Sequence, residues 1–190
     1  MKKALVGSIL GLAMTVATSY GQGKVFFNTY VGTVYSPVTY ANPVGNGATH
    51  GGTVGAGFFA ELYYGIGSGL GFNDLTKVAD SKTAVGTQVA GYVTGGIVNI
   101  PGYTSGPITF AVVCFNGDTW ETTMSSASPT AYATLLPTVW TEPEIASGQN
   151  PAGTFSQNVP AITVSLVPEP SSFALLGLGS AALLALRRRK

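Results

Sequence analysis

The stretch Ile108-Thr109-Phe110-Ala111-Val112-Val113-Cys114-Phe115 is apolar on both sides of an extended chain. A strand that is covered on both faces has a nearly continuous apolar run, whereas a half-exposed strand alternates. Residues 108–115 are therefore predicted to form a central strand of a β-sheet. The run stops at Asn116-Gly117, a dipeptide that favours the tight turn of a β-hairpin.

Four further runs have the composition of strands and are bounded by turn residues. In the second of them, alternate residues from Phe58 to Tyr64 share one face, which leaves Glu61 on the other. The third is either one interrupted strand or two strands, with the break at Gly95-Gly96. The four runs are Lys24–Tyr30, Phe58–Tyr64, Val89–Ile100 and Ala161–Leu166.

Two stretches do not have a strand pattern. Val38–Gly57 is rich in Gly, Asn and Pro and is predicted to be a long loop. Trp120–Leu136 fits a short helix, a loop, or both. Short strands separated by Gly, Pro and Asn indicate an all-β fold, so residues 22–166 are predicted to form an antiparallel β-sandwich or jelly-roll domain.

The composition excludes several classes of protein. The chain has 190 residues and 19.4 kDa, enough for one ordinary domain. Only 9% of the residues are charged, but 45% are hydrophobic and the mean hydropathy is +0.32, which is unlike a disordered chain. The net charge of +1 provides no basic footprint for nucleic acid. A single cysteine excludes an internal disulfide.

The charges are unevenly placed. Six of the nine basic residues lie within the first three or last four positions. Between Gln22 and Leu166 three lysines stand against seven acids, a balance of −4. The two basic ends therefore need an explanation separate from that of the middle.

The N-terminus has the pattern of a secretory signal peptide. Lys2 and Lys3 precede an uncharged, mostly apolar segment, Ala4–Ala17. Small residues then allow cleavage after Ser19 or after Gly21, and the second site is preferred because it leaves a short lead into the first strand. We predict a signal helix over residues 1–21; a buried core helix or a retained anchor is the alternative.

The C-terminus has a similar chemistry in another order. Val167-Pro168-Glu169-Pro170 cannot continue a helix, and a charge-free stretch of fourteen residues, Phe173–Leu186, follows. As a helix that stretch spans about 21 Å, short of the roughly 30 Å hydrocarbon core, so length alone favours a core helix. The basic block Arg187–Lys190, however, is typical of a cytoplasmic stop signal whose long side chains extend the span. A single transmembrane helix is therefore predicted over residues 172–186.

The order of these three features resembles the PEP-CTERM sorting signal of Gram-negative bacteria. The residues that carry the resemblance are Pro168-Glu169-Pro170, the apolar helix, and Arg187, Arg188, Arg189 and Lys190. The resemblance implies that exosortase, a membrane cysteine peptidase, removes the tail of an inner-membrane-anchored precursor. It further implies delivery to the cell surface, outer membrane or extracellular matrix, often beside exopolysaccharide. Cleavage is expected at or near the Pro-Glu-Pro segment.

The only histidine and the only cysteine do not make a convincing catalytic pair. His50 lies in a Gly-rich loop, where an exposed residue without a role is the favoured interpretation. Cys114 lies in the predicted central strand, and cysteine is often buried in such a position. A nucleophilic cysteine needs a nearby base, and His50 is the only histidine in the chain.

Carboxylates beside tryptophans are candidates for sugar contacts. Asp118 and Glu121 flank Trp120, whereas Glu142 and Glu144 follow Trp140. An indole face can cover the apolar face of a sugar ring while the acid binds hydroxyl groups. Trp120, Glu121 and Trp140 are thus candidate glycan contacts, although acids in solvated loops explain the same pattern more simply.

No metal or cofactor is expected. Asp74 and Asp80 could contribute to a calcium site, but no calcium-loop pattern is present and lysines lie close by. The glycines of Gly65–Gly71 do not lead into a helix with a phosphate-binding lysine. We therefore expect a structural surface or matrix protein without catalysis; a carbohydrate-binding module is the alternative, and a hydrolase ranks last.

Overall fold

A computed structural model describes residues 22–31, 34–41, 50–148, 150–155 and 159–168. The predicted signal helix (1–21) and transmembrane helix (172–186) lie outside these residues. Among the described residues, no helix has the length and apolar character needed to cross a bilayer.

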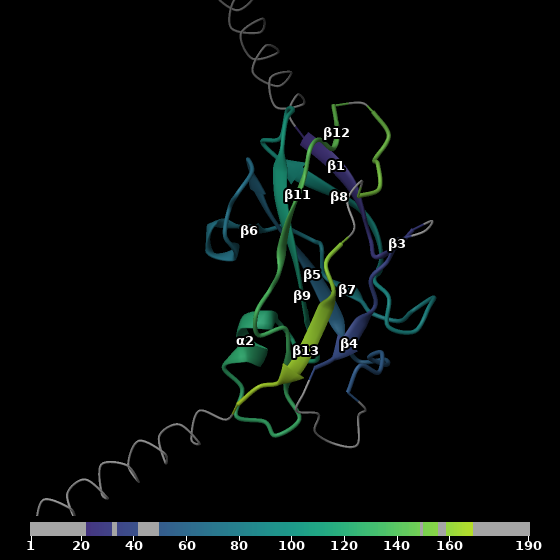
Figure 1. Cartoon of the computed structure of the whole chain (residues 1–190), viewed down its shortest axis with the longest axis vertical. Coiled ribbons are helices and arrows are strands. Elements are labelled where there is room, and N and C mark those ends of the chain that lie inside the picture. The colour runs from purple at the N-terminus through teal and green to yellow at the C-terminus, as the bar shows by residue number, and fades with distance from the viewer. Residues whose placement is uncertain (1–21, 32–33, 42–49, 149, 156–158, 169–190) are drawn as a thin grey trace, which may run out of the picture.

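Strands dominate the described part of the chain, which agrees with the predicted all-β class (Figure 1). Only one short α-helix and one 3-10 turn occur there. The elements are β1 (Gln22–Asn28), β2 (Tyr30–Val31), β3 (Val34–Tyr35), β4 (Val38–Tyr40), β5 (Phe59–Ile66), η1 (Phe72–Asp74), β6 (Thr76–Lys77), β7 (Thr83–Ala84), β8 (Thr94–Pro101), β9 (Ile108–Phe115), α2 (Trp120–Met124), β10 (Tyr132–Ala133), β11 (Val139–Glu142), β12 (Ala146–Ser147) and β13 (Ile162–Leu166).

The strand β9 is central, as predicted. All eight of its residues are buried. It pairs along one edge with the whole of β5, from Phe59 opposite Phe115 to Ile66 opposite Ile108. Along its other edge it pairs first with β11 and then with β10.

The strands form two main sheets. The larger has the order β4-β13-β10-β9-β5-β6, with β11 on β9 and β7 on β5. The smaller has the order β12-β1-β8, and β2 pairs with β3. Between named strands the described pairings are antiparallel except for β4 with β13, so the predicted antiparallel arrangement does not hold at this edge.

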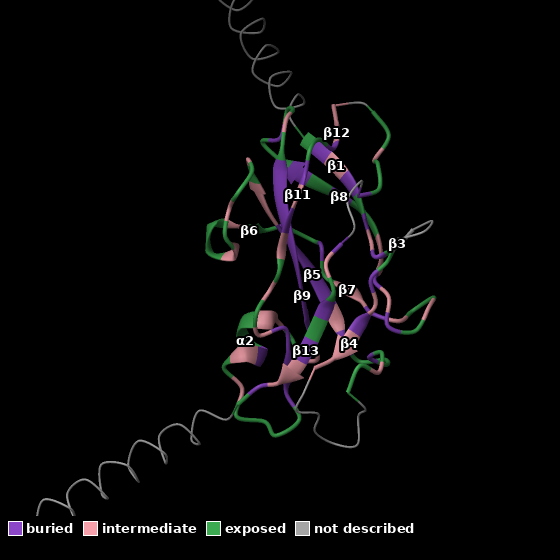
Figure 2. Cartoon of the chain, viewed as in Figure 1, coloured by how far each residue is buried: buried purple, intermediate pink, exposed green. Residues whose placement is uncertain are grey.

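Buried residues run along β9 and much of β5 (Figure 2). They divide into two clusters, one on each face of this pair of strands. The inner cluster joins the two sheets; it includes Val25 and Phe27 of β1 together with Leu62 and Val112. The outer cluster lies on the other face of β5 and β9. Its buried members are Tyr63, Ala111, Val113, Phe115, Ala131, Ala133 and Val167, with Phe72, Trp120 and Met124 packed against them.

Gly95-Gly96, the predicted break within Val89–Ile100, does not end a strand. The strand β8 runs through it, and the register shifts so that Phe27 faces two residues, which is a β-bulge. A Cβ atom on Gly95 would lie 2.7 Å from the carbonyl oxygen of Phe27, so only glycine fits there. Residues 89–93, by contrast, form turns and a single bridge rather than a strand.

Two other predictions needed correction. Asn116-Gly117 ends β9 but does not form a tight hairpin, because α2 comes next and β10 returns only at Tyr132. The side chain of Asn116 instead links to the returning chain, with Nδ2 donating to the Thr130 carbonyl at 2.7 Å and Oδ1 accepting from the Tyr132 amide at 2.8 Å. The predicted long loop Val38–Gly57 begins with the strand β4.

Candidate functional site

The folded domain extends to the residue before the Pro-Glu-Pro segment. β13 lies between β4 and β10. After it, the Val167 amide donates to the Ala131 carbonyl at 2.8 Å, and the side chain of Val167 is only 3% exposed. Pro168 is exposed, and Glu169 and Pro170 lie outside the described residues. No spacer therefore separates the last buried residue from the start of the segment.

A polar hollow of about 300 Å³ adjoins this point. It shares Ala131, whose carbonyl holds the Val167 amide, and lies between α2 and the loop that leads to β10. Its walls carry hydroxyl and amide groups, and Asp118 is the charged residue among them. The lining residues are Asn116, Gly117, Asp118, Thr122, Thr123, Ser126, Ser128, Thr130 and Ala131.

The helix α2 places Trp120 and Glu121 on the outer face of the larger sheet. Thr119 caps the helix, since its hydroxyl accepts from the Thr122 amide. The indole N–H of Trp120 donates to the Thr134 carbonyl at 2.9 Å, and the ring packs edge-on against Phe72. Trp120 is half-buried and serves to hold α2 on the sheet.

The second predicted tryptophan is in the interior. Trp140 is 9% exposed, and its indole N–H donates to Oε1 of Glu142, which is fully buried. The ring of Trp140 packs against Phe110 and Phe155. This position argues against Trp140 as a glycan contact, and it corrects the interpretation of Glu142 as an acid in a solvated loop. Glu144 is exposed.

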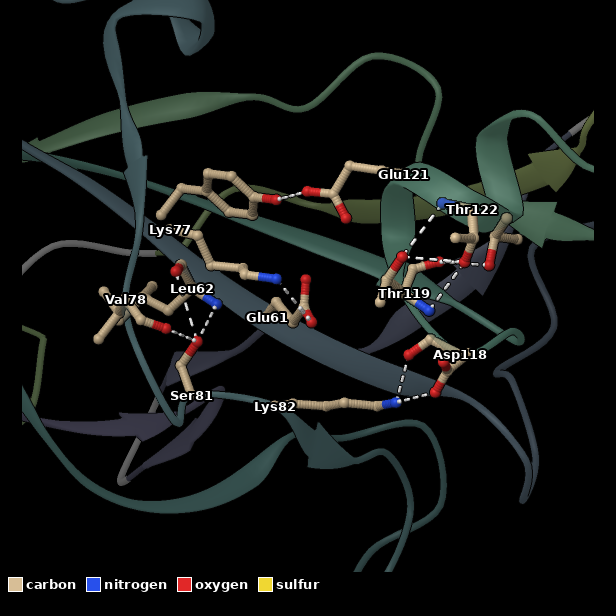
Figure 3. A network of polar contacts seen from close by, with 12 residues as sticks. Glu61, Leu62, Lys77, Val78, Ser81, Lys82, Asp118, Thr119, Glu121 and Thr122 are labelled. Carbon is tan, nitrogen blue, oxygen red and sulfur yellow. Dashed lines mark hydrogen bonds and ion pairs between the residues drawn. The ribbon is translucent and has the colours of Figure 1, made fainter.

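A buried carboxylate that the sequence did not single out lies on β5, beside Lys77 (Figure 3). Glu61 of β5 is 3% exposed, and its Oε1 is 3.6 Å from Nζ of Lys77. Its Oε2 has no hydrogen-bond partner among the described residues. Next to it, the hydroxyl of Tyr63 donates to Oε1 of Glu121 at 2.8 Å.

The environment moves the pKa values of these groups in different directions. Burial raises the pKa of Glu61, and the Lys77 charge only partly offsets this. Hydrogen bonds, first from its own backbone and then from Tyr63, lower the pKa of Glu121 despite some burial. Burial and the bond to Glu121 raise the pKa of Tyr63. Glu61 is therefore held at an energetic disadvantage when it is charged.

Lys82 holds the chain just before α2, at Asp118. Its Nζ lies 3.6 Å from Oδ1 of exposed Asp118 and donates to the Asp118 carbonyl (Figure 3). The same ammonium group lies 4.5 Å from the ring centre of Phe59. Lys82 thus links Asp118 to Phe59 of β5. Asp118 and Glu121, the two acids that flank Trp120, have different partners.

The remaining predicted residues are scattered. His50 is exposed in a turn, whereas Cys114 is fully buried in β9, and burial raises the pKa of its thiol. Asp74 caps the 3-10 turn by accepting the Gly71 amide, and Asp80 is an exposed turn residue. Within the described residues, no three His, Cys, Asp or Glu side chains come close enough to hold a metal ion.

The structure also contains an exposed cluster of tyrosines that the sequence analysis did not predict. The ring of Tyr30 lies 5.2 Å from that of Tyr35 and 5.0 Å from that of Tyr92. Tyr30 is 41% and Tyr35 55% exposed. In the smaller sheet, Phe26 of β1 and Ile97 of β8 are also paired and exposed. Tyr92 is far from the other two in sequence, so no local pattern could reveal the cluster.

Comparison with known proteins identifies the C-terminal segment. Residues 166–190 match the family model of the PEP-CTERM protein-sorting motif. No curated protein and no solved structure matches the chain. The match begins in the last residue of β13, at the point where the folded domain ends, and the chain is thus a β-rich protein that carries a PEP-CTERM sorting motif at its C-terminus.

Proposed function

We propose that this is a structural protein of the cell surface or extracellular matrix, delivered through its sorting motif by exosortase and acting without catalysis. The observation that carries the proposal is the sorting motif joined directly to a β-rich domain. Such a domain is suited to display outside the cell, because packed sheets give it a buried core.

The placement of the reactive side chains supports a role without catalysis. A nucleophile needs a base within hydrogen-bond reach. Cys114 is enclosed in the sheet, and His50 lies in an exposed turn. Glu61 and Glu121 have pKa values shifted in opposite directions, as an acid–base pair would, but Glu61 is covered by the outer layer. The hollow beside α2 does not reach Glu61.

Delivery can be tested by mass spectrometry, which identifies the C-terminal residue of protein released from the cell surface. We expect the mature chain to lack residues 173–190 in a strain with exosortase and to keep them in a matched strain without it. The Pro168→Ala, Pro170→Ala double variant should accumulate as an inner-membrane precursor. An intact C-terminus on surface protein from the exosortase-positive strain would leave only a simple membrane anchor.

A second candidate function is carbohydrate binding, which the cluster of Tyr30, Tyr35 and Tyr92 favours. Tyrosine combines an apolar ring with a hydroxyl group, and this suits a sugar ring that has an apolar face and a polar edge. A glycan array would test this candidate with the exported domain. Binding that is lost in Tyr35→Ala, kept in Tyr35→Phe, and unaffected by Leu136→Ala at another exposed position would establish it.

A further inference from the structure

We propose that the surface around the tail exit is a docking site for the membrane peptidase that processes the tail. This surface, here called the exit surface, consists of Asn116–Asp118 and Ser126–Ala131. The inference rests on the proposed sorting by exosortase and adds that the folded domain itself takes part in recognition.

The first argument is the length of free chain. Val167 is buried and hydrogen-bonded to Ala131, whereas Pro168 is exposed. Three residues, 168–170, span at most about 10 Å even when fully extended. A peptidase that cleaves at or near this segment must therefore bring its active site within about that distance of the exit surface.

The second argument is the resistance of β13 to being pulled out. Peptide-binding clefts usually hold several extended residues, and here the residues before the segment belong to β13. That strand is hydrogen-bonded on both edges, to β10 and to β4. It also buries Ile162 and Val164, and Val167 follows. Extracting it would remove a strand from inside the larger sheet, so contact with the folded domain is the easier route.

The third argument is the chemistry of the exit surface. The loop Ser126–Thr130 is uncharged, and the hollow of about 300 Å³ beside it is lined by hydroxyl and amide groups. Asp118 stands exposed at its edge. Such a surface suits a protein partner that offers hydrogen bonds. It is less suited to anionic lipid headgroups, which attract clusters of Lys and Arg.

The experiment measures the rate of tail removal from the full chain in the exosortase-positive host, by pulse-chase and intact mass. Ala127→Arg and Thr130→Arg place a bulky charge on the exit surface. Ser105→Arg is the matched control, because Ser105 is exposed in the loop at the opposite end of β9. Thermal unfolding of each variant shows whether the domain still folds.

We expect the two exit-surface variants to slow tail removal by about tenfold, as substitution at a protein interface often does, and the control to match the wild type. A twelve-residue Gly/Ser spacer between Val167 and Pro168 moves the tail away by about 20 Å. In that background the arginine substitutions should have no further effect, since the exit surface is out of reach.

Three results would overturn the proposal. One is unchanged tail removal in both exit-surface variants. Another is an equal slowing with and without the spacer, which would reflect export or folding rather than contact. The third is faster removal with the spacer alone, which would make the domain an obstacle. Failure of the unmodified chain to lose its tail would instead overturn the proposed sorting itself, together with this inference.

Discussion

The two faces of the β5–β9 pair are covered in different ways. On the inner face, Leu62, Val112 and Cys114 pack against the smaller sheet in an almost entirely apolar core. On the outer face, Phe59 and Tyr63 belong to a cluster with residues of α2 and nearby loops, and Glu61 lies between them on β5. Lys77, Lys82 and Glu121 reach across that face to make polar contacts.

The inner face mainly stabilises the domain, whereas the outer face includes the point at which the sorting tail is attached. Apolar burial is non-directional and scales with area, so the inner face determines whether the domain folds. The outer layer is a smaller apolar cluster to which a few directional contacts are added. It also contains Val167, after which the sorting tail leaves the domain, and Ala131, whose carbonyl accepts from the Val167 amide. Changes to the outer face should therefore have modest effects on stability.

The largest effect is expected from Leu62→Ala, which opens a cavity on the inner face. Leu62 is fully buried, so the free energy of unfolding should fall by about 2–5 kcal/mol. Urea denaturation of the exported domain measures this. Ile66→Ala, at a position 50% exposed on the same strand, is the control and should change it by less than about 1 kcal/mol. Similar losses in both variants would contradict the assignment of the faces.

A smaller loss is expected when the buried carboxylate of the outer face loses its counter-ion. Lys77→Met leaves Glu61 charged and uncompensated, and should cost about 1–2 kcal/mol. This is less than for a fully buried pair, because the Lys77 side chain is 40% exposed. Glu61→Leu removes the charge and should be neutral or stabilising in the same assay. A clear loss in Glu61→Leu would show that the ion pair itself stabilises the fold.

The pH dependence of stability gives a third test of the outer face. Burial raises the pKa of Glu61, so the folded state binds its proton more tightly than the unfolded state. Its contribution should therefore make the domain more stable as pH falls from 7 towards the unfolded value of about 4.3. Glu121, whose pKa is lowered, acts in the opposite sense at lower pH.

The difference between wild type and Glu61→Gln isolates this contribution. Urea midpoints at pH 7 and pH 5 should converge or cross for the two proteins, because only the wild type gains stability from protonation of Glu61. Parallel shifts of the two midpoints would mean that residue 61 does not titrate abnormally.

The smallest effect is expected from the hydrogen bond that ties α2 to β5. Tyr63→Phe keeps the buried ring but removes the donor to Glu121, and should cost about 0.5–1 kcal/mol, since Glu121 is exposed to water. Glu121→Gln, which keeps an acceptor, should cost less. Thermal unfolding resolves the order of the two variants, and a reversed order would mean that the Glu121 charge matters more than the bond.

Local patterns predicted the parts of the fold that depend on local sequence. The apolar run 108–115 indicated a central strand and placed Cys114 in it, because double-sided burial leaves a direct mark on composition. Alternation in β5 assigned Glu61 to the face opposite Leu62. That Glu61 is buried could not be predicted, since Lys77, with which it forms an ion pair, comes from another part of the chain.

The candidate sites show the same limit. The two pairs of a tryptophan and an acid look alike in the sequence. In the structure, Trp120 holds α2 on the surface, whereas Trp140 lies in the core against Glu142. The parallel pairing of β4 with β13 joins residues more than a hundred positions apart, and no local signal encodes it. The sorting motif, in contrast, is a short linear pattern and was readable directly.

The most direct test of the account is hydrogen exchange at the Val167 amide in the full chain, purified in detergent with its tail attached. If the domain is folded up to the sorting motif, that amide should exchange at least about a thousandfold more slowly than an unstructured peptide, like the core of a stable domain. The amide of Ser105 in an exposed loop serves as the fast reference. Exchange at Val167 as fast as at Ser105 would contradict the account, because the tail would then leave from a frayed strand.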